Sequence, residues 1–378
     1  MDNTVKSFEE LPSPCFVCEE ELLENNLKLL KRVQTEAGIK ILLALKGFAL
    51  YSSFDLCKEY LEGCCASGLH EALLASKEFG KEVHTYSPAF KEEEMDEIVD
   101  ISHHVVFNSF NQLKTLKHKV LGKSSIGLRV NPEYSSVEVD LYNPCGAFSR
   151  LGITKKNFLA NELEDVEGLH FHALCEQNVD ALEGALQNFE ENFGEFLPQM
   201  KWVNFGGGHH ITRVDYDVEG LITLLKEFKS RYPHLQVYME PGEAVGWQTG
   251  YLMATVLDIV ENGMQIAILD TSAEAHMPDT LAMPYRAAIR NSAEAGIKQY
   301  TYRLGGNTCL AGDIIGDYSF DKPLEVGDRI ILEDMIHYTM VKTTTFNGIK
   351  LPSIAIKKDD CYQVVKNFGY NDYKSKLS

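Results

Sequence analysis

A lysine stands at the end of an unbroken apolar run near the N-terminus. Residues 41–45 are all aliphatic, and Lys46 follows them directly, with Gly47 next. Desolvation at the end of a buried strand favours the neutral amine, which is the nucleophile of Schiff-base chemistry. The alternative is a structural lysine whose ammonium reaches water along its flexible stem. Lys46 is therefore a candidate nucleophile, and the residue alone leaves both interpretations open.

The glycine run Gly206–Gly208 follows a second apolar run, Trp202–Phe205. Backbone N–H groups in such a loop can close around a phosphate because no Cβ obstructs them. The loop has neither the GK[ST] of a P-loop nor the GxGxxG spacing of a dinucleotide site. An ordinary tight turn between a strand and a helix is the alternative. The pair His209-His210 next to it could suggest a metal, but neighbouring residues on one element point apart.

Two further residues at the ends of apolar runs could bind an aromatic ring. Glu240 closes Val237–Glu240, and a carboxylate there can keep a pyridine nitrogen protonated, so that the ring accepts electrons. The alternatives are a general acid or base, or a buried salt bridge. His172 can lie flat on such a ring, or it can be an ordinary core histidine. We expect His170 to point to the opposite face, by strand alternation.

Short apolar, β-prone runs alternate with amphipathic helical patterns from residue 39 to residue 242. This alternation is typical of a parallel α/β fold whose strands are covered on both faces. Eight strands favour a (β/α)8 barrel, and a doubly wound open sheet is the competing architecture. The expected strands are Ile39–Lys46, Gly63–Ser67, Val83–Ser87, Val105–Ser109, Ile126–Asn131, Gly168–His172, Trp202–Phe205 and Val237–Glu240. Working residues sit at the carboxyl ends of barrel strands, where the residues singled out above lie together with Ser67 and Asn131.

The alternation of β-prone runs and helical patterns stops after about residue 245. Turn signals punctuate this part at residues 326–328 and 347–348, with little helical pattern between the β-prone segments. The expected strands are Val256–Val260, Gln265–Leu269, Tyr300–Leu304, Arg329–Leu332 and Tyr338–Thr344. We predict two domains, an α/β barrel at 14–245 and a mainly β domain at 246–378 that residues 1–13 join.

Composition and termini favour a soluble intracellular protein. The 378 residues are 44% hydrophobic and 24% charged, which suits two globular domains. The start Met1–Lys6 lacks the features of a secretory signal, and no apolar stretch is long enough to span a bilayer. The nine cysteines form no regular framework, as is usual for reduced thiols. We expect a cytoplasmic protein with no metal and no membrane partner.

The charge of the chain is strongly acidic. Asp and Glu number 55 against 36 Lys and Arg, which gives a net charge of -19. Such a field repels nucleic acid and anionic membranes and attracts small cations. We therefore expect a cationic small-molecule substrate and no nucleic-acid partner, although a soluble acidic surface explains the charge equally well.

Six motifs, in order along the chain, resemble those of the fold-type III pyridoxal-phosphate decarboxylases, the alanine-racemase-like family that includes ornithine and diaminopimelate decarboxylases. The resemblance covers nearly the whole chain and implies pyridoxal 5'-phosphate as the cofactor. It implies that Lys46 is the Schiff-base lysine and that Cys309, in the GPxCxxxD-like run Gly305–Asp313, protonates the substrate carbon. The other implied cofactor contacts are Ser67 in the CASxxE-like run, the ring-stacking His172, Gly207 and Gly208 of the phosphate loop, Glu240 of the EPG motif and Tyr338.

Departures from the family pattern narrow the expected substrate. Glu243 stands where most relatives carry the arginine of EPGR, and Leu310 replaces the aspartate of the ornithine-type CD pair. The runs Thr271–Asp279 and Met283–Arg286 are similar to those of carboxynorspermidine decarboxylases. That similarity implies decarboxylation of carboxynorspermidine or carboxyspermidine in polyamine and spermidine biosynthesis. The candidates for binding the substrate's ammonium groups are Glu243, Glu274, Asp279 and Asp313.

The family resemblance also implies a homodimer, in which Cys309 and Asp313 enter the barrel of the partner. Three other functions stay open. One is a decarboxylase of the same family that acts on diaminopimelate, ornithine or arginine. A second is a regulatory protein that binds the cofactor without turnover. The third is a metal-dependent barrel hydrolase, whose ligands would be His170, His172, His209 and His210.

Overall fold

The computed structural model describes residues 4–283 and 285–378, which form two compact units. One unit is Glu24–Val245, and the other combines the N-terminal segment up to Leu23 with Gly246–Ser378. The chain therefore leaves the second unit after its first strands and returns to it at Gly246. Pro284, within the run compared with carboxynorspermidine decarboxylases, and Met1–Asn3, within the segment compared with a secretory signal, lie outside the described residues.

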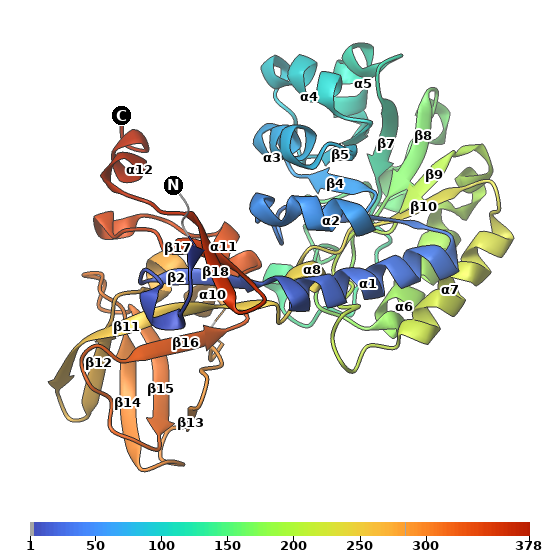
Figure 1. Cartoon of the computed structure of the whole chain (residues 1–378). Coiled ribbons are helices and arrows are strands. Elements are labelled where there is room, and N and C mark those ends of the chain that lie inside the picture. The colour runs from blue at the N-terminus through green and yellow to red at the C-terminus, as the bar shows by residue number, and fades with distance from the viewer. Residues whose placement is uncertain (1–3, 284) are drawn as a thin grey trace. The chain divides into compact units, whose positions relative to one another are not determined.

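Eight parallel strands close into a barrel in the order β10-β3-β4-β5-β6-β7-β8-β9 (Figure 1). The predicted (β/α)8 barrel is confirmed, and the open-sheet alternative is wrong. The strands are β3 (Lys40–Ala44), β4 (Gly63–Ala66), β5 (Glu82–Tyr86), β6 (His104–Phe107), β7 (Ser125–Arg129), β8 (Val166–His170), β9 (Trp202–Asn204) and β10 (Gln236–Met239).

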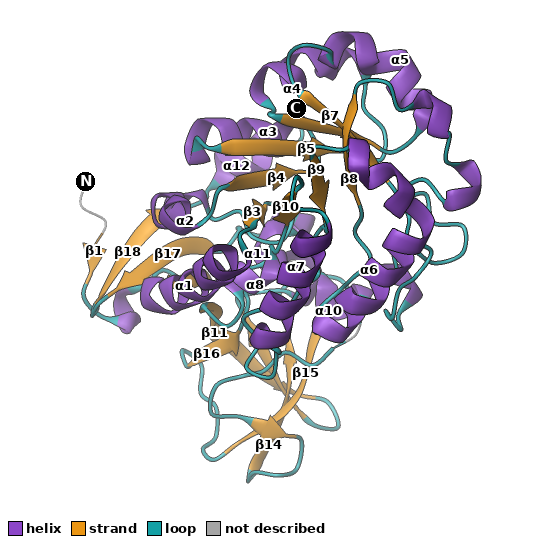
Figure 2. Ribbon diagram, turned by 90° about the vertical axis from the view of Figure 1, so that its right-hand side faces the viewer, coloured by secondary structure: helices purple, strands orange, loops and turns teal. Residues whose placement is uncertain are grey.

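Helices lie around the outside of the barrel strands (Figure 2). They are α2 (Phe54–Tyr60), α3 (Leu69–Leu74), α4 (Met95–Ile101), α5 (Phe110–Val120), α6 (Val179–Phe193) and α7 (Val218–Arg231), and α1 (Glu20–Ala37) leads into β3. Each of the longer helices is amphipathic. On α6, for example, Leu182, Leu186 and Phe189 recur at helical spacing and are all buried.

Aromatic contacts fix two strand ends to these helices. Phe171, just past β8, lies 4.9 Å from Phe189 of α6, measured between ring centroids. Phe205, just past β9, lies 5.0 Å from Phe228 of α7, and the two strand-end rings are 5.3 Å apart. Such pairs contribute about 0.5–1.5 kcal/mol each beyond the area they bury. The loops that follow these two strands therefore start from rigid positions.

The second unit is built on a ten-stranded mixed sheet, with the order β1-β18-β17-β2-β11-β12-β14-β15-β13 and with β16 paired to β11. The strands are β1 (Thr4–Val5), β2 (Cys15–Glu19), β11 (Gly250–Glu261), β12 (Gln265–Leu269), β13 (Ala293–Glu294), β14 (Tyr300–Gly305), β15 (Ile314–Phe320), β16 (Arg329–Glu333), β17 (Ser353–Lys358) and β18 (Cys361–Lys366). The helices are α8 (Glu243–Gly246), which joins the two units, α9 (Ala273–His276), α10 (Asp279–Ala282), α11 (Tyr338–Val341) and α12 (Tyr370–Ser375).

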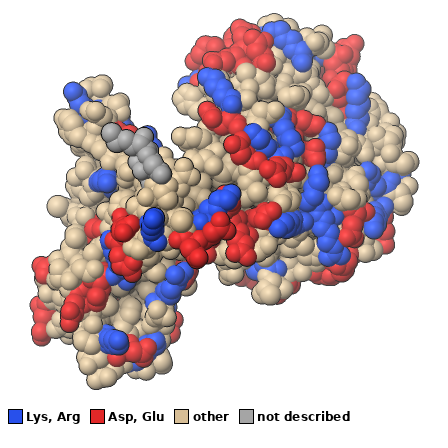
Figure 3. All heavy atoms as spheres, in the orientation of Figure 1, with Lys and Arg blue, Asp and Glu red and all other residues tan. Residues whose placement is uncertain are grey.

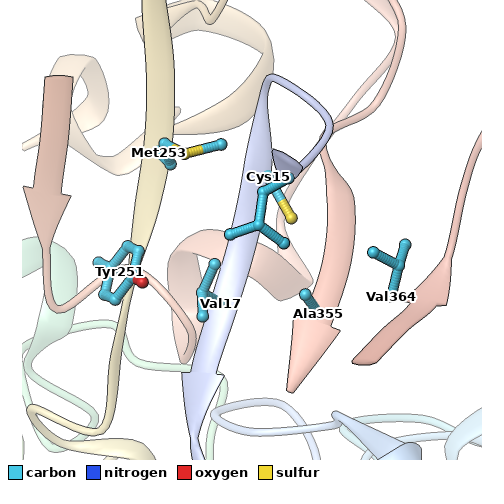
Figure 4. Packing of buried hydrophobic residues seen from close by; sticks show 7 residues of the cluster. Cys15, Val17, Tyr251, Met253, Ala355 and Val364 are labelled. Carbon is cyan, nitrogen blue, oxygen red and sulfur yellow. The ribbon is translucent and has the colours of Figure 1, made fainter. Parts of the chain in front are cut away.

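Buried side chains from distant parts of the chain cover the central strands of this sheet. Figure 4 shows Cys15 and Val17 of β2 beside Tyr251 and Met253 of β11, with Ala355 of β17 in the same cluster. The residues alternate along each strand, as they must when one face of a sheet is buried. The N-terminal segment is thus a structural part of the sheet.

Most of the strand predictions for this unit are confirmed. Gln265–Leu269 is β12, and the predicted segments that begin at Val256, Tyr300 and Arg329 lie within β11, β14 and β16. The strand predicted at Tyr338–Thr344 is wrong, because this segment starts with α11. Its Tyr, Thr and Val residues favour strands, but in a segment this short tertiary context outweighs propensity.

One CxxC spacing, Cys15–Cys18, lies within β2. Residues three apart on a strand point to opposite faces, so the two thiols do not converge. Both are buried free thiols, and burial raises the pKa of Cys15 to about 12. In the part of the chain that the structure describes, no helix is long and apolar enough to cross a membrane.

Buried histidines make the barrel sensitive to acid. His84 of β5 is 2% exposed and stacks on His104 of β6, with their ring centroids 3.8 Å apart. Burial lowers the pKa of His104 to about 2 and that of His209 to about 4. Because these values lie below the ordinary 6.5, the unfolded chain takes up protons first as the pH falls. The stability due to each neutral ring is therefore complete above about pH 6.5 and is lost below it.

We expect the free energy of unfolding to fall between pH 7.5 and pH 5.5, by up to about 1.4 kcal/mol per pH unit for each such histidine. Urea unfolding at the two pH values measures this slope. The non-titrating variant His104→Gln should flatten it, whereas replacement of the exposed His118 by Gln should not. Equal slopes in His104→Gln and in the unchanged protein would contradict this account.

Candidate active site

The predicted site residues of the barrel lie on the loops that follow its strands. Every barrel strand ends one or two residues earlier than the sequence predicted, so Lys46, Ser67, His172, Gly206 and Glu240 come just after β3, β4, β8, β9 and β10. In a closed parallel barrel all carboxyl ends meet at one rim. The structure therefore brings these residues to the same rim.

Lys46 occupies a tight turn at this rim. Gly47 and Phe48 both donate backbone hydrogen bonds to the Ala44 carbonyl, at 3.0 and 3.2 Å. The Lys46 side chain is exposed, yet it is surrounded by enough protein to change its ionisation. Desolvation and then the positive charge of Arg129 lower its pKa. A lowered pKa increases the share of the neutral amine, which is the form that acts as a nucleophile.

Arg129 is a site residue that the sequence analysis missed. It is the last residue of β7 and is 5% exposed, with its guanidinium 4.7 Å from the centroid of the Tyr86 ring. Its Nη2 donates to the His172 carbonyl at 3.3 Å. The available signal was its position, since a charged residue near the carboxyl end of a predicted barrel strand lies at the rim.

Glu240 is held by two side chains from neighbouring strands. Asn204 Nδ2 donates to Glu240 Oε1 at 2.7 Å, and His170 Nε2 lies 3.5 Å from Oε2. Burial would raise the pKa of this carboxyl, but His170 and Asn204 outweigh it and hold the pKa at about 2. Glu240 is therefore an anion at neutral pH.

The expectation that His170 faces away from His172 is wrong. Residues two apart on a strand share a face, and the His170 ring contacts Tyr86, at 5.6 Å between centroids, besides its ion pair with Glu240. His170 and Asn204 were both missed as supports of Glu240. The signal that could have found them is their place at the last position of β8 and of β9.

His172 is fixed as a neutral ring with one defined tautomer. The Gly207 N–H donates to His172 Nδ1 at 2.8 Å, so in the neutral ring the proton is on Nε2. Burial, with the nearby charges of Lys46 and Arg129, lowers the pKa of His172 well below its ordinary value. A neutral imidazole held by the backbone can stack on an aromatic ring without adding charge.

The glycine run forms a cradle in which side chains have no room. A Cβ at Gly207 would lie 2.5 Å from the Glu240 carbonyl oxygen, and one at Gly208 would lie 2.1 Å from that of Leu174. Gly208 also adopts φ +85°, a left-handed conformation that favours glycine. Within the described part of the chain, the N–H groups of Gly208 and His209 have no acceptor. Two backbone donors are thus available for an anion.

These features fit pyridoxal phosphate. Lys46 would supply an amine for its aldehyde, Glu240 an anion for its pyridine nitrogen, and His172 a neutral ring for stacking. The N–H groups of Gly208 and its neighbour can bind the phosphate oxygens. Ser67 is exposed one residue past β4, with its backbone N–H donating to Glu71 at 2.6 Å.

The four histidines considered as metal ligands each have separate neighbours. His209 Nε2 lies 3.3 Å from the Phe205 carbonyl oxygen, and His210 Nδ1 lies 3.5 Å from the Arg213 guanidinium. The other two serve Glu240 and the glycine loop, as described above. Across residues 4–283 and 285–378, no group of three or more His, Cys, Asp or Glu side chains could hold a metal ion.

Two of the remaining predicted site residues, Glu274 and Cys309, lie in the second unit on segments that follow neighbouring strands. Strands β12 and β14 are parallel, with Ile268 opposite Gly305, so the segments after them begin at the same edge of the sheet. One segment carries Glu274 and the other carries Cys309. Cys309 is exposed, and its backbone N–H donates to Asn347 Oδ1 at 2.7 Å.

The acidic candidates differ in what they contact. Asp279 forms an ion pair with Lys342, whose ammonium also lies 5.7 Å from the centroid of the Tyr338 ring. Asp313 is 3% exposed and accepts hydrogen bonds from both loop segments. Glu243 is half-buried at the start of α8. The Glu274 carboxylate is partly exposed and makes no ion pair or hydrogen bond with the described residues.

Comparison with known proteins gives consistent matches over nearly the whole chain. The family described as "Pyridoxal-dependent decarboxylase, C-terminal sheet domain" matches residues 15–336. The carboxynorspermidine/carboxyspermidine decarboxylase of Campylobacter jejuni is 52% identical, over 97% of this chain and 98% of its own. The carboxyaminopropylagmatine decarboxylase of a Synechocystis species is 48% identical, over 97% of this chain and 96% of its own.

A solved structure supports the same assignment. The crystal structure of Campylobacter jejuni carboxynorspermidine decarboxylase complexed with norspermidine has a TM-score of 0.91 and 51% identity, covering 97% of this chain and all (100%) of that chain. This chain, with its barrel, its mainly β unit and its rim residues, is thus similar to proteins that are named as decarboxylases. The protein belongs to the pyridoxal-phosphate-dependent decarboxylases with an alanine racemase-like fold.

Proposed function

We propose that this enzyme decarboxylates carboxynorspermidine, carboxyspermidine or both, and so makes norspermidine or spermidine in polyamine biosynthesis. The observation that carries the proposal is the 52% identity, over 97% of the chain, to an enzyme named for both substrates. The net charge of -19 agrees with a cationic substrate. Acidic and basic side chains are interspersed on the face seen in Figure 3, so this attraction is a property of the net charge rather than of one patch there.

The barrel rim binds the cofactor and prepares it for the reaction. Bound there, pyridoxal phosphate supplies an electron sink that accepts the electron pair released with carbon dioxide. The Lys46 amine would hold the cofactor through its aldehyde until a substrate amine takes its place. The Glu240 anion keeps the pyridine nitrogen protonated, and the neutral His172 ring stacks on the pyridine. Gly207 positions His172, and the free N–H of Gly208 binds the phosphate, to which we also assign Ser67 and Tyr338.

Cys309 is proposed to deliver a proton to the substrate carbon after carbon dioxide has left. Cys309 is exposed on the loop after β14, which supports a role in the active site of a second subunit. Leu310 beside it is 40% exposed, as expected for a loop that is covered in an assembly. We propose a homodimer in which this loop of each subunit serves the barrel of the partner. The free thiols of the nine cysteines suit the reducing conditions of the cytoplasm, where we place the enzyme.

Substrate ammonium groups need acidic side chains that are not already neutralised. Of the four candidates, Glu274 is the acid whose carboxylate is available among the described residues, so we assign it first. Glu243 is the second assignment, because it replaces an arginine of the family pattern at the start of α8. Asp279 would have to exchange Lys342 for the substrate.

A second candidate substrate is carboxyaminopropylagmatine. The observation that favours it is the 48% identity to the Synechocystis enzyme, over 97% of this chain. Its guanidinium is planar and prefers two parallel hydrogen bonds to one carboxylate, whereas an ammonium is a compact charge. The two substrates therefore make different demands on the same acidic side chains.

Carbon dioxide release from the purified holoenzyme tests these proposals. The substrates to compare are carboxynorspermidine, carboxyspermidine, carboxyaminopropylagmatine, diaminopimelate, ornithine and arginine. We expect the highest kcat/KM with one of the first two, and a smaller difference between them, because one methylene is worth about 1–3 kcal/mol in a pocket. A higher kcat/KM with carboxyaminopropylagmatine would favour the second candidate, and one with any of the last three would overturn the proposal.

Replacement of Cys309 by alanine should separate bond cleavage from protonation. We expect carbon dioxide release to continue while part of the product becomes an aldehyde, because the proton then reaches the cofactor instead of the substrate carbon. Water would supply the aldehyde oxygen and the cofactor would keep the amino group, so the assay contains excess pyridoxal phosphate to replace the cofactor that is used up. Chromatography of the products measures the ratio of aldehyde to amine, with exposed Cys361→Ala as the control. Clean amine at full rate from Cys309→Ala would remove Cys309 from the mechanism.

A further inference from the structure

One buried carboxylate joins the two loop segments that carry Glu274 and Cys309. On the first segment, Asp313 accepts hydrogen bonds from the Ser272 hydroxyl at 2.9 Å and from the backbone N–H groups of Ala273 and Glu274 at 2.7 and 3.2 Å. These donors form the start of α9. Asp313 therefore fixes the backbone of Glu274 directly.

The same carboxylate closes the loop that carries Cys309. Its Oδ2 accepts from the Thr308 hydroxyl at 2.6 Å and from the Thr308 backbone N–H at 3.2 Å. A Cβ at Gly306 would lie 2.3 Å from the same oxygen, so the loop approaches as closely as a glycine allows. The Asp313 backbone N–H donates to the Leu310 carbonyl at 3.0 Å. Residues on both sides of Cys309 are thus attached to Asp313.

These contacts leave the carboxylate little capacity for a ligand. Two carboxylate oxygens offer about four lone-pair sites, and five donors from the protein already point at them. The side chain is also closed off from solvent, at 3% exposure. An ammonium group could reach it only by displacing donors from one of the two loops.

We propose that Asp313 is a positioning residue that fixes Cys309 and Glu274 relative to each other, and that it does not bind the substrate. The inference rests on the proposed function, because it assigns the proton donor and the substrate acid to the two loops that Asp313 joins. It replaces the expectation that Asp313 itself holds an ammonium group. The parallel pairing of β12 and β14 brings the loops to one edge, and Asp313 sets their spacing there.

The isosteric variant Asp313→Asn tests the assignment in the holoenzyme. An amide has one acceptor oxygen and one NH2 group, which is a donor. In either orientation of the amide, its NH2 therefore takes the place of an oxygen that accepts two or three hydrogen bonds, and those bonds are lost. We expect hydrogen exchange to accelerate at least about tenfold at both 272–274 and 306–308, because charge-assisted hydrogen bonds are lost from both segments. We also expect the aldehyde share of the product and the KM to rise together.

Two further variants each remove hydrogen bonds between Asp313 and only one of the two loops. Thr308→Val removes one donor from the Cys309 side and should raise mainly the aldehyde share. Ser272→Ala removes one from the Glu274 side and should raise mainly the KM. The matched control is Asp317→Asn on β15, which removes a carboxylate paired with Arg303 in the same sheet and should change neither quantity.

The outcomes distinguish this inference from the function on which it rests. If the unchanged enzyme releases no carbon dioxide from any of the substrates named above, the proposed function fails. If it does, and Asp313→Asn raises only the KM while exchange at both loops and the aldehyde share stay unchanged, Asp313 is a substrate ligand and the positioning role is wrong. Faster exchange at both loops with a higher aldehyde share supports it.

Discussion

Replacement of Lys46 by alanine is expected to abolish decarboxylation, with a loss of kcat/KM of at least about 10⁴-fold. Lys46 is the amine at the rim whose pKa is lowered by desolvation and by Arg129, so no other described lysine replaces it in the same surroundings. Methyl-sized alanine leaves the turn intact, because the hydrogen bonds that close it come from the backbone. The loss should therefore reflect chemistry and not unfolding.

The measurement combines activity with a chemical mark. Borohydride reduction of the holoenzyme followed by peptide mapping should place a vitamin B6 adduct on Lys46, and the variant should yield none. Replacement of the exposed Lys226 on α7 serves as the control and should keep both the adduct and the activity. An adduct on a different lysine in the unchanged enzyme would refute the assignment of the site.

Replacement of Glu240 by glutamine should lower kcat by about 10²- to 10³-fold, which corresponds to roughly 3–4 kcal/mol of lost charge stabilisation. The side chain keeps its shape and can still accept the hydrogen bond from Asn204. What it loses is the negative charge that the low pKa, about 2, maintains at neutral pH. Without this charge the pyridine nitrogen is not held protonated, and the ring accepts electrons less readily.

Because Glu240 remains ionised down to about pH 2, the rate of the unchanged enzyme should show no loss from this carboxylate between pH 6 and pH 9. The kcat must be measured at saturating substrate and divided by the cofactor content of each preparation. Glu190→Gln on α6, which alters an ion pair with Arg231, is the matched control. A kcat within twofold of the unchanged enzyme in Glu240→Gln would exclude the proposed role of this carboxylate.

The barrel could be predicted from the sequence because its strands are short, mostly apolar runs, and all but one of the predicted runs end at a polar residue. The predicted ends were one or two residues too late, since the apolar character continues into the rim loops. In β3, for instance, the hydrogen-bonded strand stops at Ala44, although Leu45 is also buried. Lys46 was still correctly placed at the rim, because the carboxyl ends of all the parallel strands lie there and an error of two residues does not change which end of the strand Lys46 follows.

The supports of the site could not be read in the same way. Asn204 and His170 act on Glu240 across strand pairings, which depend on which strands become neighbours in the closed barrel. In the sequence motif Asp313 looked like an acid that is available to a ligand. Its burial results from two loops that follow parallel strands and meet at one end of the sheet, which the motif does not show. The wrong strand at Tyr338–Thr344 has a similar cause, because local propensity does not decide such short segments.

The insertion of the barrel within the sheet unit has a consequence for how the protein is made. Strand β2 pairs with β11 and β17, and β1 pairs with β18, so the first strands have partners that the ribosome produces more than 200 residues later. The barrel segment is complete well before β17 and β18 emerge, whereas β11 follows it directly. Biogenesis should therefore proceed from the inside outward. Strand β2 can pair first with β11, and β1 stays unpaired until the C-terminal hairpin of β17 and β18 completes the sheet.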